Sequence, residues 1–133
     1  IIEKHVLIIL KFFSIDKFQT KSSKINIFVE KLKKYIELLV NFTLWLGQKN
    51  KSSKDDVSSA CNDYLKVFGY VSLGYSWLKM LRISYEKLET NKNFFDDKIN
   101  TATYYFDKIL PRVQSHYISA ISGSKTMMKT NFN

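Results

Sequence analysis

Residues 64–81 have the sequence YLKVFGYVSLGYSWLKML, which is apolar on nearly every side of a helix. A helix that is apolar all round is normally buried all round. The stretch therefore predicts the central helix of a helical assembly. Gly69 and Gly74 would each cost roughly 1 kcal/mol relative to alanine inside a helix. We therefore expect another backbone to approach this helix closely at both glycines.

The composition favours a helical domain with its own core. The chain has 133 residues, of which 45% are hydrophobic, and this content excludes a disordered chain. One proline and four glycines leave little material for the turns of a β fold. We expect an all-α fold in which residues 1–133 form a single helical domain.

Hydrophobic periodicity predicts about four helices, of which the first covers residues 1–13 and is followed by a polar connection over 14–23. The second begins near Lys24 and ends near Leu46, with Gly47 as its stop signal. Apolar residues recur along it in steps of three and four, at Ile25, Phe28, Leu32, Tyr35, Leu39, Phe42 and Leu46. Ser53 and Asp56 resemble a capping box and predict the start of the third helix.

The fourth helix is expected to begin near Asn93. Pro111 should kink or break it, Gly123 should end it, and residues 124–133 should form a loose tail. Short connections between long helices predict an up-down antiparallel bundle with the third helix at its centre. Because the chain begins with Ile1 rather than methionine, we expect a C-terminal piece of a longer protein. Residues 1–23 are a candidate bridge to its upstream domain.

The net charge of +9 is a weak signal for an anionic partner, because 19 of the 21 basic residues are lysine. Interfaces that read nucleic-acid bases favour arginine. We interpret the lysine-rich runs 17–24 and 49–54 as solvated loops and expect no nucleic-acid partner. The apolar run 6–10 is too short to span a membrane. The single cysteine, Cys61, excludes an intrachain disulfide and favours a reducing, cytoplasmic location.

No residue pattern supports a catalytic, metal or cofactor site. His5 and His116 lack the glutamate spacing of a di-iron bundle, and we expect Cys61 to be buried on the apolar stripe of the third helix. The glycines of this helix do not form a phosphate loop, because no strand precedes them. Four aromatic side chains are expected off the main seam, as candidates for contact with another domain or subunit. They are Tyr70, Trp77, Tyr104 and Tyr105.

Two blocks of sequence together resemble a known domain. Residues 64–80 and residues 104–112, YYFDKILPR, are similar to the extra C-terminal helical domain of one branch of bacterial acyl-CoA dehydrogenases. That branch includes enzymes acting on 3-methylmercaptopropionyl-CoA. The resemblance covers roughly residues 25–128, and the lysine- and tyrosine-rich composition departs from the alanine-rich norm of the family. The matching positions are Phe68, Gly69, Val71, Gly74, Tyr75, Trp77, Phe106, Leu110 and Pro111.

The resemblance implies an FAD-dependent parent enzyme that oxidises an acyl-CoA to its 2,3-enoyl-CoA and passes electrons to a partner protein. Its catalytic glutamate and its flavin- and CoA-binding segments would lie upstream, so this chain alone should be inactive and bind no FAD. The implied role is to pack on the catalytic body and to shape the interface of a homo-oligomer. Two alternatives stay open: a helical protein-interaction module, and a cationic bundle that binds nucleic acid or an anionic membrane.

Overall fold

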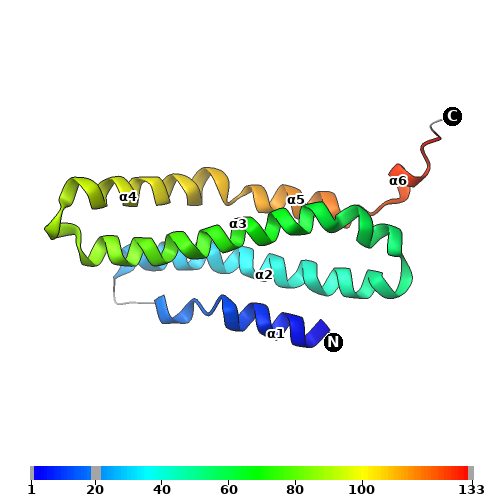
Figure 1. The fold of residues 1–133 in the computed structure, drawn as a ribbon, viewed down its shortest axis with the longest axis horizontal. Helices are drawn as coiled ribbons and strands as arrows, with labels where there is room; N and C mark the ends of the chain where they lie inside the picture. The colour runs from blue at the N-terminus through cyan, green and yellow to red at the C-terminus, as the bar shows by residue number, and fades with distance from the viewer. Residues whose placement is uncertain (1, 19–21, 132–133) are drawn as a thin grey trace.

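Four long helical segments run back and forth along the molecule in a computed structural model that describes residues 2–18 and 22–131. They are α1 (Ile2–Phe12), α2 (Ser23–Ser52), α3 (Lys54–Glu86) and the pair α4 (Lys92–Tyr104) and α5 (Arg112–Ile121). Consecutive segments are antiparallel (Figure 1). The described residues contain no strand. The predicted all-α, up-down bundle is therefore confirmed.

The third helix is central, as predicted. Figure 1 shows α3 between α2 and the α4–α5 segment, and α3 packs against all three of these helices. Helix α1 lies against α2 on the outer side. Short elements join or follow the long helices: η1 (Asp16–Phe18), η2 (Leu88–Thr90) and α6 (Lys125–Met128). Residues 19–21 of the predicted connection and residues 132–133 of the predicted tail lie outside the described residues.

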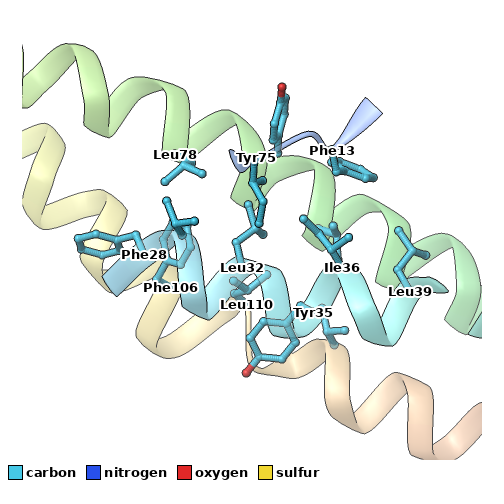
Figure 2. Close-up of a cluster of buried hydrophobic side chains, with 14 of the residues drawn as sticks. Phe13, Phe28, Leu32, Tyr35, Ile36, Leu39, Tyr75, Leu78, Phe106 and Leu110 are labelled. Atoms are coloured by element: carbon cyan, nitrogen blue, oxygen red, sulfur yellow. The ribbon is translucent and has the colours of Figure 1, made fainter. Parts of the chain in front are cut away.

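The core forms where the apolar stripe of α2 meets α3 and α5 (Figure 2). Six of the seven residues predicted for this stripe are buried, and Leu46 is half-buried. Phe28 and Phe106 meet edge to face with their ring centroids 5.1 Å apart, and Phe42 meets Tyr64 in the same way at 5.2 Å. Such aromatic pairs add to the stabilisation that burial alone gives.

Gly74 lies at a close helix crossing, as predicted, but its neighbours are side chains rather than a backbone. A Cβ atom at Gly74 would lie 2.9 Å from Leu32 Cδ1 and 3.4 Å from Leu110 Cδ1. The same prediction is wrong for Gly69, which is exposed and has no neighbouring atom within 4 Å of a Cβ position. Helix α3 has apolar residues on every side, but its neighbours cover only the side that contains Gly74.

The predicted end of the second helix at Gly47 is wrong. Helix α2 continues to Ser52, so residues 49–52 of the run interpreted as a loop are helical. Gly47 is buried inside the helix, and the side chain of Ile2 occupies the space that a Cβ atom at Gly47 would need. This glycine therefore provides the notch in which α1 packs against α2.

The other boundary signals agree with the structure. Ser53 caps α3, because its hydroxyl accepts a hydrogen bond of 3.3 Å from the Asp56 amide. Proline cannot donate a helical hydrogen bond, and the helix breaks before Pro111 into a π-helical turn, η3 (Tyr105–Ile109). In that turn the Leu110 amide donates to the Tyr105 carbonyl over 2.9 Å. Gly123 follows α5 with a φ of 82°, a conformation that glycine adopts readily.

Cys61 is a further correction, because it is exposed rather than buried. Its thiol donates to the Val57 carbonyl of its own helix over 3.2 Å. Ala60 and Val67 instead fill the covered side of α3 in this region.

The two glycines of α3 give a matched test of this packing. Gly74→Leu should lower the free energy of unfolding by roughly 1–3 kcal/mol, because it overpacks the space that Leu32 and Leu110 fill. Gly69→Leu should leave it unchanged or raise it by up to about 1 kcal/mol, because leucine favours the helix and the site is open. Urea unfolding in dilute solution measures both values. Equal losses at the two positions would contradict the structure.

Candidate functional site

One histidine links two helices, and the other is exposed to solvent. His116 Nδ1 of α5 lies 2.8 Å from Asp63 Oδ1 of α3, and the His116 ring stacks on Tyr70 with centroids 5.9 Å apart. His5 is exposed on α1. Within residues 2–18 and 22–131 there is no group of three side chains suited to hold a metal ion. The contacts of His116 therefore fasten α5 to α3.

Three of the four aromatic candidates are used inside the bundle. Tyr105 is 8% exposed and donates its hydroxyl to the Tyr70 carbonyl over 2.8 Å, and this burial raises the pKa of its phenol. Trp77 lies beside it, with ring centroids 6.4 Å apart. Tyr70 and Trp77 are half-buried. Only Tyr104, which is 60% exposed, keeps most of its ring available to a partner.

Exposed apolar side chains gather instead on α1 and α3, which sequence patterns alone did not single out. On α1, Leu7, Ile8, Leu10 and Phe12 are between 47% and 62% exposed. We call these four residues the α1 surface. Single exposed apolar residues are common on soluble proteins, whereas here four of the 11 residues of one helix are both exposed and apolar.

Helix α3 exposes a second apolar surface, the α3 stripe, which lies on the side where Gly69 is open. Its members are uncharged and lie one, three or four residues apart, so they share one side of the helix. They are Leu65, Gly69, Ser72, Leu73, Ser76, Met80 and Ile83. Near its end, Met80 and Ile83 line a cleft of about 210 Å³ together with Phe94 and Phe95 of α4.

A carboxylate at the start of α3 fastens the chain that follows α5. Asp56 Oδ1 accepts hydrogen bonds from the Ser124 amide, over 2.8 Å, and from its hydroxyl, over 2.7 Å. Asp56 Oδ2 lies 3.1 Å from Lys49 Nζ. The prediction of a loose tail is therefore wrong at its start. Ser124 is buried, and the residues that follow it form α6.

These bonds also explain why Asp56 does not complete the capping box with Ser53. Its carboxylate turns away from that residue toward a segment 68 residues further along the chain. The hydrogen bonds from Ser124, with a smaller contribution from Lys49, hold the pKa of the Asp56 carboxyl well below its usual range.

This shift predicts a pH-dependent difference between the protein and its Asp56→Asn variant. A lowered pKa in the folded state stabilises the fold above the unfolded value of about 4, and the stabilisation is lost as the pH falls below that value. The stability advantage of the protein over Asp56→Asn should therefore be largest near neutral pH and shrink below about pH 4. Thermal unfolding across this range measures it. The exposed neighbour gives the control, Asp55→Asn, and a pH-independent difference for Asp56→Asn would contradict the account.

No helix in the described part of the chain is both long enough and apolar enough to cross a membrane. A family model described as acetyl-CoA dehydrogenase C-terminal like matches residues 11–131. The match takes in α2 to α6 and leaves nearly all of α1 outside. None of the curated proteins or solved structures compared with the chain matches it.

Proposed function

The chain belongs to the acetyl-CoA dehydrogenase C-terminal-like family, and we propose that it is the non-catalytic C-terminal domain of a cytoplasmic, FAD-dependent acyl-CoA dehydrogenase. The observation that carries the proposal is the family match over residues 11–131. We further place the parent enzyme in the branch that includes enzymes acting on 3-methylmercaptopropionyl-CoA, because both blocks of that resemblance occur here in order. The parent enzyme would oxidise an acyl-CoA thioester to the 2,3-enoyl-CoA.

Packing inside the bundle supports this proposal, because the two blocks touch. Tyr105 of the second block donates its hydroxyl to the Tyr70 carbonyl of the first. Leu110, also of the second block, packs over Gly74 of the first. The residues that carry the resemblance therefore form the contact between α3 and the π-helical turn.

We propose that the flavin belongs to the catalytic body rather than to this chain. All four glycines are accounted for without a phosphate group: Gly47 packs under Ile2, Gly74 packs under Leu32, Gly69 lies within α3, and Gly123 turns beside Asp56. The clefts found among these residues include the apolar one beside Phe94 and an open groove along α2 between Ser23 and Lys34. Neither has the strand and glycine-rich loop that hold a dinucleotide. These observations support a structural part for this chain.

We assign the contact with the catalytic body to the α1 surface. Helix α1 precedes the region that matches the family, and it packs mainly against α2. Its outward side chains, Leu7, Ile8 and Leu10 among them, leave an apolar surface that a preceding domain would cover. In this arrangement α1 joins the two domains, and the notch at Gly47 fixes its position on the bundle.

The α1 contact can be tested in the full-length protein with Ile8→Glu. A carboxylate placed in a buried apolar interface should loosen the contact, so hydrogen exchange of the α1 amides should become at least about tenfold faster. Flavin absorbance should stay unchanged, because the catalytic body is untouched. The control is Lys4→Glu on the same exposed helix, which should change exchange little. Equal exchange in the protein and in Ile8→Glu would contradict the assignment.

A further inference from the structure

We propose that Lys17 of η1 and Lys79 of α3 bind the phosphate group of a phosphate monoester at the hydroxyl of Tyr75. Both ammonium groups lie close to the same tyrosine ring. Lys17 Nζ is 5.6 Å from the centroid of the Tyr75 ring, and Lys79 Nζ is 4.8 Å from it. The inference does not depend on the proposed function, because it rests on contacts within this chain.

Tyr75 supplies a hydrogen-bond donor that the bundle itself does not use. The residue is 7% exposed, and its ring packs edge to face on Phe13 and Phe18, with both centroid distances 5.6 Å. The hydroxyls of Tyr64 and Tyr105 bond inside the bundle, whereas no group in residues 2–18 and 22–131 bonds to the Tyr75 hydroxyl. That hydroxyl reaches the surface, and Figure 2 shows it pointing away from the core leucines. It is therefore available to a ligand.

The two lysines beside this hydroxyl also lack a carboxylate partner. Ion pairs in the described part of the chain neutralise other lysines, such as Lys31 and Lys49, but none of them includes Lys17 or Lys79. Two cations held near one ring repel each other, and an anion bound between them relieves this repulsion. The site therefore favours a negatively charged ligand.

Other charged groups nearby do not reverse this preference. Arg82 adds a third cation, with its Cζ 5.2 Å from the centroid of the Phe18 ring. An oxygen of Glu86 lies 3.8 Å from Arg82 Nε, which is too far for a hydrogen bond. Asp16, although it precedes Lys17, lines a different cleft, against α2. The net charge of +9 on the whole chain also favours the approach of anions.

This set of donors suits a phosphate monoester better than other common anions. Lysine binds phosphate as a point charge, whereas a planar carboxylate is best matched by the fork of an arginine. A phosphate monoester carries about −1.5 to −2 charges at pH 7, which two ammonium groups balance. A phosphate diester, as in a nucleic-acid backbone, carries a single charge. The Tyr75 hydroxyl then donates to a phosphate oxygen.

Phosphorus NMR of methyl phosphate titrated with the full-length protein tests the site. Lys17→Gln and Lys79→Gln should each weaken binding at least about fivefold, because each removes one of the two cations. Tyr75→Phe should weaken it at least about threefold, because it removes the donor and keeps the ring. Lys79→Arg, which keeps the charge, should retain most of the affinity. Dimethyl phosphate, with one charge, should bind at least about fivefold more weakly than methyl phosphate.

The matched control is Lys98→Gln on α4. Lys98 Nζ lies 5.3 Å from the centroid of the Phe94 ring, so the variant removes the same charge and a similar contact, but Phe94 offers no hydroxyl. Its affinity for methyl phosphate should be unchanged. Hydrogen exchange of the amides of residues 16–18 should slow when methyl phosphate is added, which locates the bound group. Unchanged affinity of Lys79→Gln, or unchanged exchange at residues 16–18, would overturn the proposal.

Sedimentation with phosphatidylcholine vesicles that contain phosphatidate distinguishes the two sources of a monoester. Binding of methyl phosphate without binding to these vesicles would assign a soluble ester. Binding to the vesicles alone, lost in Lys79→Gln, would assign a lipid headgroup to the same site. Binding to neither would overturn the proposal. A colourless protein that binds methyl phosphate through Lys79 would overturn the assigned parent enzyme and support the phosphate site.

Discussion

The close packing of three segments at Gly74 holds the bundle together. Because Gly74 has no side chain, Leu32 of α2 and Leu110 at the end of the π-helical turn both reach the surface of α3. Both leucines are fully buried, and Leu78 and Phe106 pack in the same cluster (Figure 2). A Cβ atom at position 74 would require the Leu32 side chain to shift, and a larger side chain would also press on Leu110.

The π-helical turn is the second constraint, and it follows from Pro111. A continuous helix from Lys92 to Ile121 would need a hydrogen bond that proline cannot donate. The turn absorbs the break and directs Tyr105 and Leu110 toward α3, where they bond to Tyr70 and cover Gly74. Beyond it, His116 and Asp63 fasten α5, and Asp56 fastens the chain at Ser124. The α4–α5 segment therefore follows α3 for almost its whole length (Figure 1).

Sequence patterns predicted the structure best where each pattern allowed a single structural interpretation. The apolar stripe of α2 faces a single side, so its buried residues were predictable, and the effects of Ser53 and Pro111 follow from local chemistry. Helix α3 is apolar on every side, so its pattern could not show that Gly69 and Cys61 lie on the side without a neighbour. Gly47 looked like a helix end because the sequence alone cannot distinguish a glycine that ends a helix from one that makes room for a neighbouring helix. The bonds from Asp56 to Ser124 join segments too distant for any local motif to reveal.

The proposed function accounts for the exposed α1 surface, which the catalytic body of a parent enzyme would cover. Its central claim is that this bundle is part of a larger flavoenzyme. The most direct test is the intact mass and visible absorption spectrum of the protein purified from its complete native gene. The account predicts a polypeptide much larger than 15.7 kDa with the absorbance of bound flavin. A colourless protein of about 15.7 kDa from a complete gene would contradict it.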